Sequence, residues 1–265
     1  MSGYQIAFTG LQRQYKNLRE EILDVTDQVL ASGQLMNGHY TQAFETWLAE
    51  KNNTKYAVTC HSGTNALEIL ACYWAEQETI NPPTVVLPAV SYVATANAFI
   101  RAGWDVYFAD VDAYGLINPD TLPHNLSYQA VVLVGLYGAA VTHQVRVNHW
   151  HKWVHENTII IEDAAQHWLA AECKRIGTGA AISFDPMKNL ACYGNGGAVV
   201  TDNSDIVNFA KDFRDNGKHI GHRGTGSNCR MSELDCASMM VKTAYLDDWQ
   251  ERRREIAWQY MQGFQ

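Results

Sequence analysis

Short apolar runs alternate along this chain with longer amphipathic stretches, and no other feature constrains the fold as much. The apolar runs occupy residues 55–60, 85–87, 106–109, 130–134, 159–161 and 199–201. Predicted helices occupy residues 14–31, 40–51, 63–74 and 94–102, and helices are expected to dominate from Met231 onward. Continuous β-branched runs are typical of buried strands that are covered on both faces. The alternation therefore predicts an α/β fold.

The composition excludes several classes of function. The chain has 265 residues and is 47% hydrophobic, which is enough for a large core. Its formal net charge of -8 argues against nucleic-acid and membrane-surface partners, because phosphate backbones and anionic lipids select basic surfaces. No apolar run is long enough to span a membrane, and the first residues do not resemble a signal peptide. We therefore expect a cytoplasmic protein whose six cysteines are reduced.

Polar residues follow three of the predicted strands at the point where each strand ends. They are Ser62-Gly63-Thr64, Ser91-Tyr92 and Asp163. Ligands of open α/β sheets gather just outside the carboxyl ends of the strands. These residues are therefore expected to meet at one edge of the sheet.

Each of these positions has two interpretations. Ser62, Gly63 and Thr64 would offer a hydroxyl and free N–H groups to a phosphate, but they also fit an ordinary helix N-cap. Tyr92 would stack on a cofactor ring, or it is an ordinary core or surface tyrosine. Asp163 would pair with a protonated pyridine nitrogen, because an unpaired buried carboxylate is costly, or it caps the next helix.

Lys188 lies in a short loop between two apolar runs. Ser183 precedes it by five residues, and the glycine turn at residues 194–197 follows it. A lysine that can form a Schiff base, an aspartate facing a pyridinium nitrogen and donors for a phosphate are the protein parts of a pyridoxal 5'-phosphate site. Gln166 lies one turn after Asp163 and is expected to hydrogen-bond the phenolic oxygen of the same ring.

Two other clusters favour structural interpretations. His149, His151 and His155 have a spacing that suggests a metal site, but no nearby acid or cysteine completes a ligand set, so we assign no metal. The run at residues 252–254 is flanked by acidic residues, which is typical of a solvated helix face with local ion pairs.

Eight segments, taken in order, carry a family resemblance. They are residues 8–18, 32–33, 61–67, 88–95, 162–166, 183–190, 226–231 and 253–260. Together they resemble the sugar aminotransferases of the DegT/StrS type, in the fold type I class of pyridoxal phosphate enzymes. The resemblance implies a three-layer sandwich with a mostly parallel central sheet.

The resemblance also implies a role for each matching residue. Lys188 would bind the cofactor covalently and then move the proton between substrate and cofactor. Asp163 would pair with the pyridine nitrogen, Gln166 would contact the phenolic oxygen, and Tyr92 would stack on the ring.

The phosphate would be held by residues from two subunits. Gly63, Thr64 and Ser183 would hold it from one chain, with Ser62 beside them. Asn228 matches an asparagine that reaches the phosphate of the neighbouring subunit. The resemblance therefore implies a homodimer with shared active sites.

The reaction implied is the transfer of an amino group from an amino acid, usually glutamate, to a keto group of a nucleotide-linked sugar. A related dehydratase branch has histidine where this chain has Lys188, so the lysine favours transamination. Two positions depart from the family pattern. Asp185 stands where histidine or tyrosine is common, and Asn195 stands where glutamate is common.

The domain organisation follows from the same resemblance. Residues 1–240 are expected to form the cofactor-binding large domain, and residues 241–265 a helix that would lead into a small C-terminal domain, which is absent here. One alternative function is therefore a truncated homologue that binds pyridoxal phosphate with little or no catalytic activity, acting as a partner subunit or a relic. A second alternative is a metal-binding module that uses the three histidines.

Overall fold

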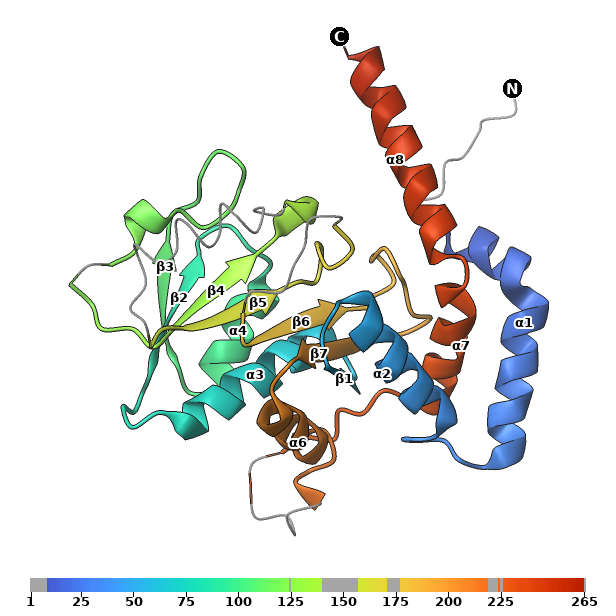
Figure 1. Cartoon of the computed structure of the whole chain (residues 1–265), viewed down its shortest axis with the longest axis horizontal. Helices are drawn as coiled ribbons and strands as arrows, with labels where there is room; N and C mark the ends of the chain where they lie inside the picture. The colour runs from blue at the N-terminus through green and yellow to red at the C-terminus, as the bar shows by residue number, and fades with distance from the viewer. Residues whose placement is uncertain are drawn as a thin grey trace.

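A single seven-stranded sheet organises the molecule (Figure 1). The computed structural model describes residues 9–123, 125–139, 157–170, 177–218, 224 and 226–264. The strands are β1 (Tyr56–Cys60), β2 (Thr84–Pro88), β3 (Asp105–Ala109), β4 (Ala130–Val134), β5 (Ile159–Asp163), β6 (Gly179–Ser183) and β7 (Gly197–Thr201), in the spatial order β1-β7-β6-β5-β4-β2-β3. Neighbours are parallel from β3 through β6, whereas β7 is antiparallel to both β6 and β1.

Helices cover both faces of the sheet. They are α1 (Leu11–Ser32), α2 (His39–Lys51), α3 (Gly63–Gln77), α4 (Val93–Arg101), α6 (Ser204–Phe213), α7 (Glu233–Thr243) and α8 (Leu246–Gly263), with short 3-10 turns η1 (Pro119–Thr121) and η2 (Leu136–Gly138). Helices α3, α4 and α6 share one core cluster with the sheet, and α2 and α7 share another on the opposite face. The expected three-layer α/β sandwich is therefore confirmed.

The second of these cores fixes the ends of the loop that carries Lys188. Phe184 and Leu190 are fully buried in it, and the Phe184 ring lies 5.2 Å from that of Phe44 in α2. Burying a side chain of this size contributes roughly 1.5–3 kcal/mol. The two apolar residues that flank Lys188 therefore hold the loop against α2.

The elements expected from the sequence are present, with differences at their ends. Helix α1 begins at Leu11 and ends at Ser32. Gly33 caps it with a left-handed φ of 68°, which glycine adopts without cost. Two elements are not among those expected, namely β6 and α6.

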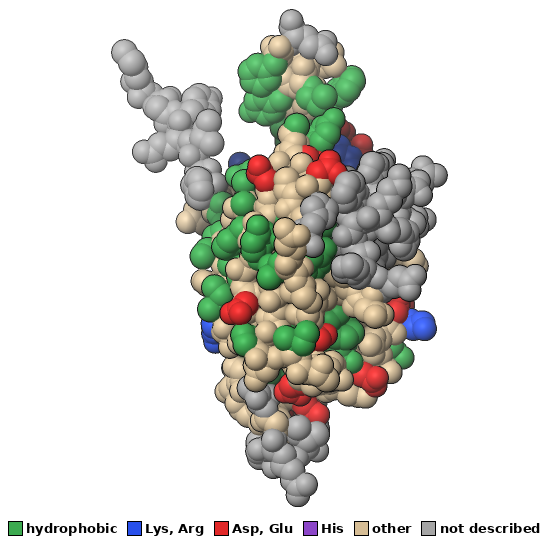
Figure 2. Space-filling view, turned by 90° about the vertical axis from the view of Figure 1, so that its left-hand side faces the viewer, with side chains coloured by type: hydrophobic (Ala, Val, Ile, Leu, Met, Phe, Trp, Pro, Cys, Tyr) green, Lys and Arg blue, Asp and Glu red, His purple; other side chains and the backbone are tan. Residues whose placement is uncertain are grey.

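Strand β3 contradicts the expectation that every strand is buried. Tyr107 is 42% exposed and Phe108 is 54% exposed. The reason is its position, because β3 is the last strand of the sheet and pairs only with β2. Figure 2 views the molecule from this edge, and apolar side chains are visible on its surface.

The helices and the cysteines can be compared with the remaining expectations from the sequence. No helix in the described part of the chain is long and apolar enough to cross a membrane. Five cysteines are free, and Cys173 lies outside the described residues, as do His149, His151 and His155. The arginines of helix α8 lie on a solvated face, as expected. Arg252 pairs with Glu255 and Arg254 pairs with Glu251, each three residues away.

Candidate active site

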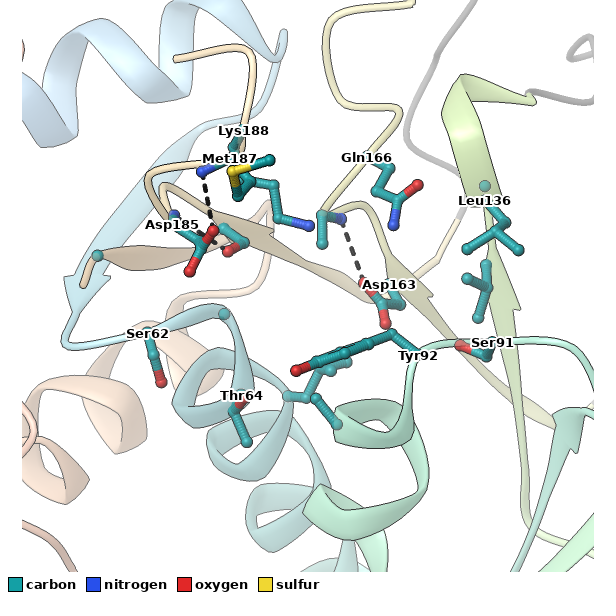
Figure 3. Close-up of a pocket in the computed structure, with 18 of the residues that line it drawn as sticks. Ser62, Thr64, Ser91, Tyr92, Leu136, Asp163, Gln166, Asp185, Met187 and Lys188 are labelled. Carbon is teal, nitrogen blue, oxygen red and sulfur yellow. Dashed lines mark hydrogen bonds between the residues drawn. The ribbon is translucent and has the colours of Figure 1, made fainter. Parts of the chain in front are cut away.

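A cavity of about 530 Å³ lies at the carboxyl ends of the strands (Figure 3). Its size is within the range typical of small-molecule sites. Eight of the nine residues expected to bind the cofactor line it, namely Ser62, Gly63, Thr64, Tyr92, Asp163, Gln166, Ser183 and Lys188. They come from segments separated by up to 126 positions, and the parallel strands bring them to one edge of the sheet.

Lys188 is presented by a tightly bonded loop. Its backbone N–H donates to the carbonyl of Asp185 at 2.8 Å, and the Asp185 carboxylate accepts the N–H of Met187 at 2.9 Å. Cys192 N–H closes the loop by donating to the carbonyl of Phe184 at 2.7 Å. Figure 3 shows the Lys188 side chain extending into the cavity. Within the described residues its side-chain nitrogen has no hydrogen bond or ion pair, so no other side chain holds it away from a ligand in the cavity.

Asp163 is the last residue of β5 and is only 6% exposed. One carboxylate oxygen accepts the Thr95 hydroxyl at 2.7 Å, and the other accepts the N–H of Ala165 at 3.2 Å. Both contacts donate to the carboxylate and fix its orientation. A carboxylate held in this way at the wall of a cavity suits a protonated ring nitrogen.

The N-terminus of α3 is shaped for an anion. Ser62 is the N-cap, and its hydroxyl accepts the Asn65 N–H at 3.1 Å while it donates to the Asn65 side chain at 2.8 Å. The N–H groups of Gly63 and Thr64 precede the first intrahelical bond and point out of the helix end. Ser62 is thus an N-cap, which confirms that interpretation of the segment, and it leaves these backbone donors available.

Ser183 and Gly63 approach each other closely. A Cβ atom at position 63 would lie 2.7 Å from the Cβ of Ser183. Only glycine permits this contact, which brings the end of β6 beside the N-terminus of α3. The Ser183 hydroxyl and the helix N-terminus thereby form one polar corner of the cavity.

Gln166 is oriented by its backbone surroundings. Its side-chain oxygen accepts the N–H of Tyr137 at 2.7 Å, and Tyr137 has a left-handed φ of 55°. Since the oxygen is engaged, the amide NH2 remains as a donor toward the cavity. Tyr92 is 68% exposed, and Figure 3 shows its ring reaching across the cavity next to Asp163.

Asn228 does not line this cavity. Asn228 is exposed between the half-buried Ser227 and the buried Cys229. It forms a β-bridge with Asp215 and accepts a hydrogen bond from Arg230 at 3.1 Å. It is therefore not brought together with the other eight residues within one chain. Asp185 and Asn195, the two departures from the family pattern, do line the cavity.

Two residues near the site carry no signal strong enough to single them out in the sequence. Thr95 lies on the buried side of α4, one turn after Ser91. Lys242 is fully buried in α7, where its ammonium donates to the carbonyl of Ala191 at 2.5 Å and lies 3.5 Å from the centre of the Tyr193 ring. The apolar run at residues 239–241 before Lys242 was the available clue to its burial.

Burial sets the protonation of the groups around Lys242. It lowers the pKa of Lys242 from its usual 10.5 to about 8, against a smaller opposing effect of Cys192 and Asp235. It raises the pKa of the Cys192 thiol to about 12, so Cys192 remains a thiol that donates to Asp235 at 3.3 Å. Cys192 is thus a structural thiol rather than a nucleophile.

Comparisons with known proteins show the family of this chain. Residues 16–265 match the model of the DegT/DnrJ/EryC1/StrS aminotransferase family. The chain is 30% identical to a pleiotropic regulatory protein of Geobacillus stearothermophilus, over 96% of this chain and 69% of that protein. It is also 30% identical to dTDP-3-amino-3,4,6-trideoxy-alpha-D-glucose transaminase of Streptomyces venezuelae, over 98% of this chain and 69% of that protein.

A solved structure extends the similarity to the fold. The crystal structure of DesV from S. venezuelae in complex with a ketimine intermediate superimposes with a TM-score of 0.88 at 28% identity. The match covers 98% of this chain and 71% of that one.

Proposed function

Because this chain belongs to the DegT/DnrJ/EryC1/StrS aminotransferase family, we propose that it transfers an amino group from an amino acid, glutamate by the family pattern, to a keto group of a nucleotide-linked sugar. The family uses pyridoxal phosphate. The observation that supports the proposal is the meeting of Lys188, Asp163 and the N-terminus of α3 in one cavity.

The residues present fit this cofactor on structural grounds. Asp163 offers a buried carboxylate that accepts two hydrogen bonds, Lys188 offers an amine without a partner among the described residues, and Gly63 leaves N–H groups at a helix end. When bound, pyridoxal phosphate supplies a carbonyl that condenses with amines and a ring that accepts the electron pair of a broken bond.

We propose the following roles for the chain's own residues. Lys188 binds the cofactor through Nζ and, once displaced, carries the proton between the two carbon atoms that exchange the amino group. Asp163 holds the proton on the ring nitrogen, and the Gln166 NH2 donates to the phenolic oxygen. Tyr92 covers the ring, while Gly63, Thr64 and Ser183 bind the phosphate, with Ser62 supporting them as the N-cap.

The assembly is part of the proposal. Asn228 lies outside the cavity of its own chain and on the surface, which suits a contact to the phosphate of a second copy. We also propose that residues 1–240 are the cofactor-binding domain and that residues 241–265 are a connecting helix. Exposed apolar side chains on α8, such as Trp258 and Phe264, support a connecting role (Figure 2).

The half-reaction with glutamate tests the proposal. Protein loaded with pyridoxal phosphate is mixed with glutamate, and the visible absorbance and the release of 2-oxoglutarate are followed. The enzyme should lose the visible band and release one equivalent of 2-oxoglutarate per site, and a nucleotide-linked keto sugar should restore the band. A stable visible band with no 2-oxoglutarate from any amino acid would instead identify the chain as a cofactor-binding homologue without turnover.

A further inference from the structure

Two hydroxyl groups, those of Ser91 and Thr95, are linked by hydrogen bonds to Asp163. The Ser91 and Thr95 hydroxyl oxygens are 2.7 Å apart, and the Thr95 oxygen is 2.7 Å from a carboxylate oxygen of Asp163. Thr95 has one hydroxyl proton, and it donates this proton to the carboxylate. The Ser91 hydroxyl must therefore donate to Thr95, so both hydrogen bonds run in one direction, from Ser91 through Thr95 to Asp163.

Burial makes these hydrogen bonds more than a surface contact. Thr95 is 1% exposed and Asp163 is 6% exposed, whereas Ser91 is half-buried and lines the cavity. Hydrogen bonds are stronger in such surroundings, and a donor that itself accepts a hydrogen bond is strengthened further. The Ser91 contact therefore reinforces the bond from Thr95 to the carboxylate.

The contacts leave the cavity side of the carboxylate open. Thr95 and the Ala165 N–H occupy one acceptor position on each oxygen, and each oxygen has two. Thr95 lies in the first turn of α4, where the positive end of the helix dipole favours a nearby carboxylate. Donors behind the carboxylate stabilise its charge without using the positions that a ligand would need.

We propose that Ser91 and Thr95 form a positioning relay that holds the Asp163 carboxylate aimed at the cavity. The inference rests on the proposed function, in which Asp163 contacts the ring nitrogen of pyridoxal phosphate. In this proposal the two hydroxyls act through Asp163, and their loss weakens the pairing of the carboxylate with the ring nitrogen.

The test uses full-length protein and pyridoxal phosphate labelled with 15N in the ring. Thr95→Val removes the donor at nearly constant volume, Thr95→Ser restores it, and Ser91→Ala removes only the outer hydroxyl. The control is Thr201→Val, since Thr201 is also buried and donates to a backbone carbonyl, that of Thr178 at 2.6 Å, in another part of the sheet. The readouts are the dissociation constant of the cofactor and the 15N shift, which reports whether the ring nitrogen is protonated.

Thr95→Val should weaken cofactor binding roughly tenfold and move the 15N shift toward that of an unprotonated ring. Thr95→Ser and Thr201→Val should match the wild type, and Ser91→Ala should change both readouts in the same direction by a smaller amount. If Thr95→Val does not fold, Ser91→Ala decides the question.

Three outcomes would overturn the relay. Wild-type readouts for Thr95→Val would show that the hydroxyl is not needed, and so would an unchanged Ser91→Ala if the valine variant is unfolded. Equal losses in Thr201→Val would show that the effect is general destabilisation. If the wild type itself binds no pyridoxal phosphate, the proposed function fails together with the relay. In the other two outcomes the wild type binds the cofactor normally, so the relay fails while the proposed function stands.

Discussion

Two lysines are associated with the loop from Phe184 to Gly196, and their surroundings are opposite. Lys188 reaches into the cavity without a hydrogen-bond partner among the described residues, whereas Lys242 is fully buried between the Ala191 carbonyl and the Tyr193 ring. A lysine that reacts needs an accessible amine, and a lysine that supports structure needs acceptors around it. Burial alone therefore does not identify the lysine that reacts.

The largest expected effect comes from removing Lys188, the lysine that reaches into the cavity. Lys188→Ala should abolish the visible absorbance of the cofactor-loaded protein, because no other amine lines the cavity within the described residues. Lys242→Gln should keep the band. Titration of both variants with pyridoxal phosphate under a spectrophotometer checks this, and a normal band in Lys188→Ala would reverse the assignment of the two lysines.

The next effect is that of the carboxylate opposite Lys188. Asp163→Asn keeps the shape but removes the charge and one of the two oxygens that accept from Thr95 and Ala165, so cofactor affinity should fall about a hundredfold. Equilibrium dialysis measures the affinity. Asp185→Asn serves as the matched control, because Asp185 also lines the cavity but has no assigned contact to the ring nitrogen. An equal loss in both variants would mean that the cavity responds to total charge and not to Asp163.

The buried lysine should be visible in the pH dependence of stability. Burial lowers the pKa of Lys242 in the folded protein to about 8, whereas its usual value is 10.5. Between these values the unfolded chain binds more protons than the folded one, so this group makes the free energy of unfolding rise with pH. The rise is complete above 10.5 and is lost as the pH falls through 8.

The measurement is the difference between wild type and Lys242→Gln, since tyrosines and cysteines titrate in the same range in both proteins. Glutamine retains a donor for the Ala191 carbonyl. Urea unfolding at pH 7.5 to 10 should show the wild type gaining stability relative to the variant, by at most about 1.4 kcal/mol per pH unit. A difference that stays constant with pH would show that Lys242 is not destabilised by its burial.

The smallest effect is expected from α8. Arg253 donates to the carbonyl of Asn189, next to Lys188, at 3.1 Å from an exposed helix. Burial of part of the guanidinium lowers the pKa of Arg253, which nevertheless stays charged. Arg253→Gln should lower the melting temperature by no more than a few degrees and change cofactor affinity less than threefold. A larger loss of affinity would show that α8 controls the position of the Lys188 loop.

Much of the sheet could be predicted from the sequence, for a physical reason. The runs at 130–134 and 159–161 are continuous and β-branched, and they form the central strands β4 and β5. Strand β6 has the sequence Gly-Ala-Ala-Ile-Ser, whose small residues are needed because α3 packs closely on it: a Cβ at Gly179 would lie 2.7 Å from Leu70. Small residues carry no strand signal, so β6 could be found only from the structure.

The site was predictable where a residue follows a strand end, as with Asp163 and the segment from Ser62 to Thr64. It was not predictable where a partner comes from a distant segment. Thr95 contacts Asp163 across 68 positions, and Lys242 contacts Ala191 across 51. Neither pairing leaves a local pattern, because the contact depends on how the helices pack against the sheet.

The most direct test of the central claim identifies the lysine that holds the cofactor. The wild-type protein is loaded with pyridoxal phosphate, reduced with borohydride and digested, and the modified peptide is sequenced by mass spectrometry. We predict a single modification at Lys188 and none at Lys242. Modification at Lys242, or at no lysine, would contradict the assignment of the cavity as a pyridoxal phosphate site built around Lys188.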